Sequence, residues 1–356
     1  ALGLDPGYRT GCKTAVVDAT GKVLDTGVIY PAPPHKKIEQ AKTLLKDWVR
    51  RYGIQIVAIG NGTASHETEV FAADLLRELA AEGYTDIAYM VVSEAGASVY
   101  SASKLAAEEF PEYDVSLRSA VSIARRLQDP LAELVKIDPK AIGVGQYQHD
   151  MPPAQLSDAL DGVVEDCVNA VGVDVNTASV PLLARVAGIG GAVAKNIVAY
   201  REENGAFTTR SQFKKVPKLG PKAFEQCAGF LRVPESRNLL DHTGVHPESY
   251  DAAKRLLELC GLTLEKVRRE GALLEKAVQD MGEEVLAAEI GVGIPTLRDM
   301  VSELSRPGRD PRDELPPPLL RTDVMGLDDL KPGMELTGTV RNVIDFGAFV
   351  DIGVHQ

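Results

Sequence analysis

Two short glycine turns stand out in the sequence because a tight turn before a helix can present backbone N–H groups to an anion. The first turn contains Gly188, Gly190 and Gly191, and the second contains Gly220. Glycine permits positive φ and a close approach of the main chain to a ligand, and the first N–H groups of a helix have no partner inside it. These turns predict phosphate binding. Three lysines add charge around them: Lys195, Lys218 and Lys222.

The two turns belong to one pattern written twice, with each position of the second copy thirty residues after the first. Apolar residues coincide at positions 183/213, 186/216, 189/219 and 197/227, and glycine coincides at 190/220. Each copy predicts a short helix, a tight turn and a second helix. Thr209 and Gln212 form a capping-box pattern that opens the second copy, and Pro221 suits the first position of a helix.

Charge separates this region from the rest of the chain. The 356 residues carry a formal net charge of −12, yet residues 173–236 hold nine Lys and Arg against five Asp and Glu. A basic island between acidic flanks indicates an electrostatic footprint for nucleic acid. The alternative is a pair of ordinary helical hairpins, in which the glycines serve only the fold.

Residues 173–236 resemble the tandem helix-hairpin-helix module of non-sequence-specific DNA-binding proteins. The resemblance implies an all-α domain in which each hairpin holds one phosphate of a nucleic-acid backbone without reading bases. The binding residues that we predict in the two hairpins are those of the turns and the lysines beside them: Gly188, Gly190, Gly191, Lys195, Lys218, Gly220 and Lys222.

Carboxylates form a second group of residues that could do chemistry. Asp5 follows an apolar first strand, Glu94 follows a later one, and Asp158 and Asp161 lie three residues apart on one face of a predicted helix. Carboxylates that converge at strand ends can hold Mg²⁺ or Mn²⁺, and paired metal ions support in-line hydrolysis of a phosphodiester. All four are candidate catalytic residues, and Asp5, Glu94 and Asp161 are the candidate metal ligands.

The elements that would position these carboxylates fall in residues 1–172. Periodicity predicts strands at 1–5, 12–18, 22–30, 54–59 and 87–92, with helices at 36–51 and 67–82. Three hairpin-linked strands followed by alternating helix and strand is the order of the α/β RNase H-like fold. The start Gly3-Leu4-Asp5-Pro6-Gly7 resembles the YqgF and RuvC branch of that fold, whose members cut nucleic-acid junctions with two metal ions.

One stretch departs from that branch. Gly60-Asn61-Gly62 stands where the junction resolvases have a glutamate after the fourth strand. An amide can coordinate a metal but brings no charge, so we expect weaker affinity for Mg²⁺. The sequence therefore predicts a degenerate nuclease fold that is kept for binding or scaffolding and requires no cofactor. The alternative is a metal-dependent, structure-selective nuclease of the RuvC type.

The remaining sequence predicts three further parts. Residues 237–305 read as an all-α region with helices from 246 to 261, 264–270, 272–290 and 295–304, and the proline-rich residues 306–322 read as an extended linker. Residues 323–356 resemble the start of the all-β OB-fold module named for ribosomal protein S-one, which binds RNA. Phe346 and Phe349 lie near its glycine bend and are candidate base-stacking residues, although core packing is the alternative for one of them.

Composition limits the class of protein. The chain is 44% hydrophobic and 25% charged, which is typical of soluble globular proteins, and it has no apolar run long enough to enter a membrane. Its four cysteines are far apart and form no C-x-x-C pair, which predicts reduced thiols in a cytoplasmic protein. Because the chain begins directly on a strand and stops within another, we expect it to be part of a longer protein.

The order of the parts is itself a pattern. A YqgF-like domain, tandem helix-hairpin-helix motifs, a helical region and the start of an S-one-type OB module together resemble the Tex family of bacterial transcription accessory proteins, over essentially all 356 residues. The resemblance implies RNA and DNA as partners and a role beside the transcription machinery. Spacing and composition alone give a multi-domain binder of nucleic acid.

Overall fold

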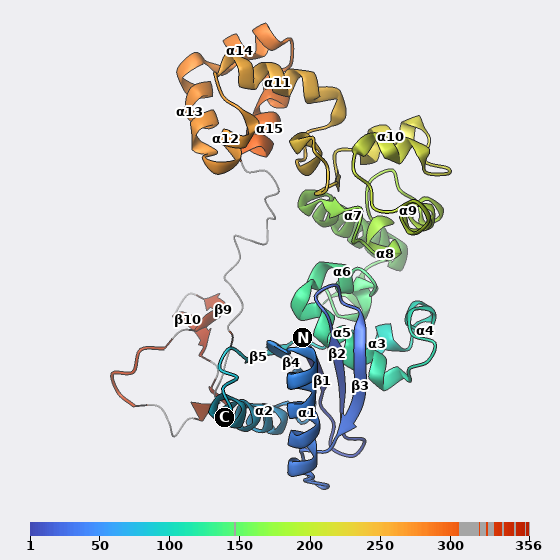
Figure 1. Cartoon of the computed structure of the whole chain (residues 1–356), viewed down its shortest axis with the longest axis vertical. Helices are drawn as coiled ribbons and strands as arrows, with labels where there is room; N and C mark the ends of the chain where they lie inside the picture. The colour runs from blue at the N-terminus through green and yellow to red at the C-terminus, as the bar shows by residue number, and fades with distance from the viewer. Residues whose placement is uncertain are drawn as a thin grey trace. The chain divides into compact units, whose positions relative to one another are not determined.

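The computed structural model divides the chain into two compact units (Figure 1). The first contains residues 1–142 with 318–356, and the second contains residues 143–317. The structure describes residues 1–145, 147–305, 320, 325–326, 331–336, 338–344, 347–352 and 354–355. The predicted limits at 172, 236, 305 and 322 divide the chain more finely and stay predictions. Nearly all of the proline-rich stretch 306–322 lies outside the described residues.

A five-stranded sheet forms the centre of the first unit, in the order β3-β2-β1-β4-β5. The first three strands pair antiparallel, and β1, β4 and β5 run parallel. This is the RNase H-like arrangement that the sequence predicts. The strands are β1 (Leu2–Asp5), β2 (Cys12–Val17), β3 (Val23–Ile29), β4 (Ile56–Gly60) and β5 (Ala88–Val92).

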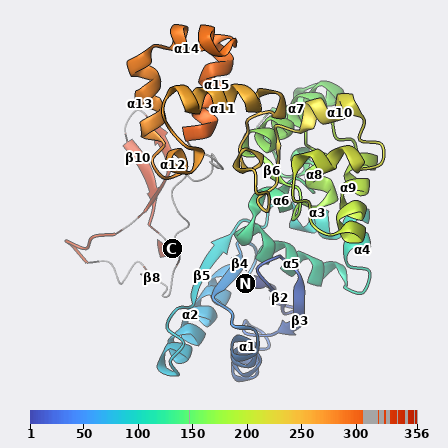
Figure 2. The ribbon, with the colours of Figure 1, turned by 45° about the horizontal axis from the view of Figure 1, so that its top comes forward.

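Helices cover both faces of this sheet. The main core packs α1 (Ile38–Tyr52) and α2 (Ser65–Ala81) against one face, and these two helices lie on the same side in Figure 2. Helix α5 (Val115–Gln128) packs on the other face, against Ala15 and Val17. A Cβ atom at Gly3 would lie 2.2 Å from the carbonyl oxygen of Ala120. Glycine at this position therefore lets α5 cross directly over β1, next to Asp5.

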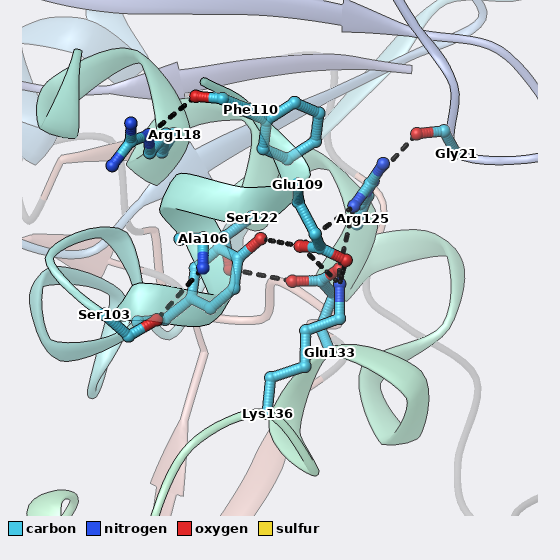
Figure 3. Close-up of polar contacts among 11 residues, drawn as sticks. Gly21, Ser103, Ala106, Glu109, Phe110, Arg118, Ser122, Arg125, Glu133 and Lys136 are labelled. Atoms are coloured by element: carbon cyan, nitrogen blue, oxygen red, sulfur yellow. Dashed lines mark hydrogen bonds and ion pairs between the residues drawn. The ribbon is translucent and has the colours of Figure 1, made fainter. Parts of the chain in front are cut away.

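A buried ionic network joins the short helices that follow β5 (Figure 3). Lys136 Nζ lies 2.8 Å from Glu133 and 3.0 Å from Glu109, and Arg125 lies 3.5 Å from Glu133. Ser122 donates to Glu133 at 3.1 Å. Two cations and two carboxylates balance each other, so the network fixes the fold. The short helices of this part are α3 (Ala97–Ser101), α4 (Lys104–Glu109), α6 (Pro130–Leu134) and the 3-10 turn η1 (Pro139–Ala141).

The second unit begins with a short 3-10 turn and a long helix, which precede the two predicted hairpins. Strands β6 (Val173–Asp174) and β7 (Leu231–Arg232) pair parallel and bring the start and end of the hairpin region together. The other elements of this part are η2 (Gln148–Asp150), α7 (Pro153–Val171), α8 (Val180–Leu183), α9 (Gly191–Asn204), η3 (Arg210–Lys215) and α10 (Pro221–Cys227).

A helical bundle with its own apolar core completes the second unit. The prediction of one helix over 272–290 is wrong, because Gly282 takes a φ of 87° and ends the first of two helices. The bundle contains η4 (Leu239–His242), η5 (Pro247–Ser249), α11 (Tyr250–Leu259), α12 (Leu264–Arg269), α13 (Ala272–Met281), α14 (Glu283–Ile290) and α15 (Ile294–Ser305).

The described residues near the C-terminus form short strands, as the OB resemblance predicts. Strands β9 (Thr339–Ile344) and β10 (Gly347–Asp351) pair antiparallel on either side of the predicted glycine bend, and β8 (Met325–Gly326) pairs parallel with β11 (Val354–His355). Across the part of the chain that the structure describes, no helix is long and apolar enough to cross a membrane.

Candidate nucleic-acid interface

The two hairpins repeat each other down to their backbone hydrogen bonds. In both copies the chain makes the same three bonds, and the lengths agree within 0.1 Å. The paired apolar positions of the repeat are buried in both copies, with at most 5% exposed. The equivalent N–H to carbonyl bonds are Val186 to Leu183 and Val216 to Phe213, Ile189 to Val186 and Leu219 to Val216, and Ala194 to Gly190 and Phe224 to Gly220.

Backbone conformation also repeats between the two turns. Gly190 and Gly220 have φ of −82° and −76°, so neither of them uses the positive φ that glycine permits. The left-handed residue comes two positions earlier, at Gly188 (φ 79°) in the first turn and at Lys218 (φ 65°) in the second. A lysine held in this uncommon conformation shows that the turn geometry is kept even where glycine is absent.

Gly190, Gly191 and Gly220 have no structural need to be glycine. A Cβ atom at any of the three would meet nothing within 4 Å, and the φ angles of Gly190 and Gly220 suit any residue. Because these three residues have no side chain, the main chain at the start of α9 and α10 is accessible. The first N–H groups of a helix lack intrahelical partners and favour an anion. The three glycines therefore fit close approach of a phosphate.

The copies pack on each other through equivalent contacts. Gly188 of the first turn lies against α10, where a Cβ would come within 2.7 Å of Gln226 Cβ. In return, Asn196 of α9 donates to the carbonyl of Pro217 in the second turn at 2.7 Å. Asn196 and Gln226 are thirty residues apart, so each second helix supports the turn of the other copy. This pseudo-symmetric packing fixes the spacing of the two turns.

The basic surface of the hairpins is smaller than the sequence predicts, because four of the nine cations in residues 173–236 are buried or paired within the fold. Arg210 is 2% exposed and donates to carbonyls of Leu231 (3.0 Å) and Val245 (2.7 Å) and to the Tyr250 hydroxyl (2.7 Å). Arg232 is also turned inward, and burial lowers its pKa to about 10. Arg185 pairs with Asp161, and Arg201 donates to Val175 O. The exposed cations near the turns are Lys195, Lys214, Lys215, Lys218 and Lys222.

A third turn of the same kind lies in the bundle, and the sequence reading missed it. Gly291 is left-handed (φ 82°), and Leu297 N–H bonds to Gly293 O at 3.0 Å, as at the start of α9 and α10. The Gly-Val-Gly spacing before Pro295 was the available signal. The charges around this turn are mainly acidic, including Glu289 and Asp299, so it lacks the cations that surround the first two turns.

Asp5 at the end of β1 and Glu94 just after β5 lie close enough for their charges to interact, and their role as metal ligands stays a prediction. Asn61 holds the end of β5, since its Oδ1 accepts from the Glu94 N–H at 3.0 Å. The Glu94 carboxylate lies over the glycines of Gly60-Asn61-Gly62, where a Cβ at Gly62 would be 1.8 Å from Oε1. Arg126 supports the same loop by donating to the carbonyls of the two residues beside Glu94, Ser93 and Ala95, both at 2.8 Å.

The environment of Asp5 destabilises the ionised form of its carboxyl group. The pKa of Asp5 is raised to about 6, chiefly by burial and also by the nearby Glu94 carboxylate, while a hydrogen bond from Ser119 and the charge of Lys13 oppose the shift. An acidic group whose charged form is destabilised in this way is typical of a functional site. The pair would gain from a bound cation, because the cation would offset the repulsion between the two carboxylates.

Asp158 and Asp161 lie on one exposed face of α7, in the second unit. Asp161 pairs with Arg185 of the first hairpin, at 2.6 Å. Their role as catalytic carboxylates stays a prediction.

The donor set suits one divalent cation better than two. Within the described ranges, no group of three or more His, Cys, Asp or Glu side chains is placed to hold a metal ion. Asp5 and Glu94 supply two carboxylates, and Asn61 Oδ1 is already committed to a backbone N–H. Mg²⁺ is commonly held by one or two carboxylates together with substrate oxygens and waters. These residues therefore fit a single Mg²⁺ or Mn²⁺.

Only one of the two predicted stacking aromatics can be described. Phe349 lies on β10 and is 55% exposed, next to an irregularity in its pairing with β9. This exposure favours a surface role for Phe349 over core packing. Phe346 lies outside the described residues.

Three models of known protein families match parts of this chain. Residues 1–128 match the model of the Tex protein YqgF-like domain, and residues 168–232 match the helix-hairpin-helix motif. Residues 238–312 match a third model, the HHH domain. The last match agrees with the Gly291 turn, and the sequence had predicted only a helical region there.

Relatives cover the whole chain. Protein tex of Bordetella pertussis is 56% identical over 100% of it, and transcriptional accessory protein Tex of Neisseria gonorrhoeae is 54% identical over 100%. The human S1 RNA-binding domain-containing protein 1 is 41% identical over 99%. The chain spans 44%, 45% and 40% of the lengths of these relatives, so it is similar to about half of each. With three matching domain models in the same order, the chain belongs to the Tex family.

Proposed function

We propose that this chain binds the sugar–phosphate backbone of RNA and DNA without selecting a base sequence. The observation that carries the proposal is the pair of equivalent turns, in which Gly190 and Gly220 are glycine although the fold does not require it. Main-chain donors at Gly191 and Lys222 would face successive phosphates. Such contacts fix position on a strand but carry no direct sequence information.

The exposed lysines give the interface its charge. Lys195, Lys218 and Lys222 are all solvent-exposed beside the turns. Their ammonium groups would displace condensed counterions from the nucleic acid, so binding should weaken as salt rises.

The relatives extend the proposal to a cellular role. One is named a transcriptional accessory protein, and another is named for an RNA-binding domain. We infer that this chain serves as a cytoplasmic nucleic-acid scaffold beside the transcription machinery. The α/β unit would then act in binding and positioning.

Binding measured by fluorescence anisotropy tests the proposal. The panel contains duplex DNA, single-stranded DNA and single-stranded RNA of several unrelated sequences, each over a salt series. We expect similar affinity across sequences and a log–log salt slope of about −0.9 for each duplex phosphate contacted. Affinity that depends strongly on sequence and little on salt would exclude a backbone interface.

A second candidate function is a metal-dependent nuclease, which the meeting of Asp5 and Glu94 favours. Two carboxylates fit one divalent cation, whereas efficient in-line displacement commonly uses two, so we expect little cutting. A Mg²⁺ and Mn²⁺ titration with single-stranded, duplex and branched substrates measures it. Robust cutting that disappears in Asp5→Ala, with binding unchanged, would establish the nuclease instead.

A further inference from the structure

A groove runs beside the second turn and has no use in the backbone contacts proposed above. Its volume is about 450 Å³, which lies in the range of small-molecule sites. It is formed by the end of η3, the start of α10 and the segment around η5. The lining residues are Lys214, Leu219, Pro221, Phe224, Glu225, Pro247 and Glu248.

The first hairpin shows that these side chains are not needed to build the fold. Phe224 stands where the first copy has Ala194, and Lys214 stands where it has Ala184. Both copies nevertheless share their backbone hydrogen bonds and buried apolar positions. The ring and the lysine are therefore additions to the second copy, at the positions that line the groove.

The walls of the groove are held in place. His246 Nε2 lies 2.9 Å from the carbonyl oxygen of Glu225, which joins the segment before η5 to α10. The N–H of Glu248 donates to His246 Nδ1 at 3.3 Å, so the same imidazole also fixes the start of η5. A groove with fixed walls loses little entropy when a ligand enters.

Charge decides what kind of ligand the groove suits. Glu225 and Glu248 are exposed carboxylates on its lining, and they repel a phosphate. The same carboxylates accept hydrogen bonds from the amino groups of a base. Lys214 Nζ lies 4.7 Å from the centroid of the Phe224 ring. This exposed lysine can leave the ring for a phosphate, and the ring face would then be open for stacking.

We propose that the groove binds one unpaired nucleobase, stacked on Phe224, while the adjoining phosphate lies on the turn at Gly220 and Lys222. The inference rests on the proposed backbone binding and adds a preference for strands that can offer an unstacked base. Stacking tolerates all bases because each has a π-face. The second hairpin therefore distinguishes single strands from duplex, and the first does not.

Two probes separate the base from the backbone: a single-stranded DNA of mixed sequence, and an abasic strand of the same length with every phosphate present. Anisotropy is measured for the whole chain and for Phe224→Leu, Phe224→Trp and the matched lysine variants Lys214→Gln and Lys215→Gln. Lys215 is exposed beside Lys214 but does not line the groove. We expect Phe224→Leu to lose about tenfold on the intact strand, within the range for base stacking, and nothing on the abasic strand.

Phe224→Trp should keep the affinity for the intact strand, and the introduced indole should be quenched by it beyond the background of Trp48, the single native tryptophan. Lys214→Gln should weaken intact-strand binding more than Lys215→Gln does. Unchanged binding of the abasic strand by Phe224→Leu shows that this variant is folded. Equal affinity of Phe224→Leu and the parent for the intact strand overturns the groove proposal. Failure of the parent to bind the abasic strand at low salt overturns the backbone proposal instead.

Discussion

The two candidate sites of this chain handle charge in opposite ways. At the sheet edge, Asp5 and Glu94 bring two carboxylates together under partial burial, and the pKa of Asp5 rises to about 6. At the hairpins, Gly190 and Gly220 expose main-chain N–H groups among lysines. The first site calls for a cation, and the second calls for an anion.

The comparison indicates how a functional site can be recognised within a fold. Both sites contain a feature that folding alone does not explain: a carboxylate that is costly to ionise in one, and glycines without strain or close neighbours in the other. In the proposed function the hairpins would bind a phosphate directly, whereas the sheet edge would bind one only through a metal ion. On this contrast we propose the hairpins as the principal interface.

The largest effect should come from removing the support of the hairpins. Arg210→Met leaves the carbonyls of Leu231 and Val245 without their buried donor and removes a hydrogen bond to the Tyr250 hydroxyl, and each buried acceptor left unsatisfied costs about 1–3 kcal/mol. Hydrogen exchange over a urea series, read on peptides from residues 173–305, measures the loss. The exposed Lys215→Met is the control and should change stability by less than about 0.5 kcal/mol. Equal behaviour of the two variants would mean that Arg210 does not stabilise this unit.

Within the first turn, we expect Gly188 to be needed for stability and Gly190 to be needed for binding. Gly188→Ala places a Cβ 2.7 Å from Gln226 at a φ of 79°, so we expect a cost of about 1–3 kcal/mol in unfolding free energy. Gly190→Ala meets no neighbour and should stay within about 1 kcal/mol of the parent, yet bind strands more weakly. Urea unfolding and anisotropy on the same preparations test this. A Gly190→Ala protein with full affinity would remove the functional reason for that glycine.

The sheet edge should respond to pH. The folded pKa of Asp5, about 6, lies above its ordinary value of 3.8, so its ionisation opposes folding above pH 6. The cost fades as pH falls from 6 to about 4. Asp5→Asn should therefore stabilise the α/β unit at pH 8 by about 1–3 kcal/mol, and the gain should disappear near pH 4. Unfolding curves at both pH values decide it, and a variant less stable than the parent at pH 8 contradicts the assignment.

The smallest effect is expected at the OB strands. Phe349→Ala, made in a protein that carries the whole OB module, should weaken single-stranded RNA binding by about 1 kcal/mol, the lower end for stacking of one base. Val343→Ala, on the exposed part of β9, is the control. Phe349→Ala should bind RNA more weakly than Val343→Ala. Equal affinities of the two variants would mean that Phe349 is exposed but does not stack on a base.

Much of this structure could be predicted from local sequence. Alternating apolar runs gave every strand of the sheet, and the thirty-residue repeat gave both hairpins with their buried positions. Asp5 and Glu94 follow directly from strand ends in a known strand order. The repeat even located Lys218 opposite Gly188, although its left-handed conformation became visible only in the structure.

What local sequence could not supply depends on contacts between distant segments. The burial of Arg210 comes from carbonyls more than twenty residues away, so counting charges overstated the basic surface. The sequence places an uncharged amide, Asn61, where related nucleases have a glutamate, but only the structure shows that its oxygen accepts from the Glu94 N–H. The groove at Phe224 likewise needs Pro247 and Glu248 from another element.

The central claim is that the paired turns bind backbone phosphates, and a double substitution tests it most directly. Gly190→Glu combined with Gly220→Glu puts a bulky anion at both turns without touching the buried Val186, Ile189, Val216 or Leu219. Binding to duplex DNA and to RNA is measured over a salt series, with circular dichroism of the same samples. The account predicts a folded protein with much weaker binding and a salt slope flatter by roughly 0.9 for each duplex phosphate lost. A folded double variant that binds both nucleic acids as tightly as the parent at every salt concentration would contradict it.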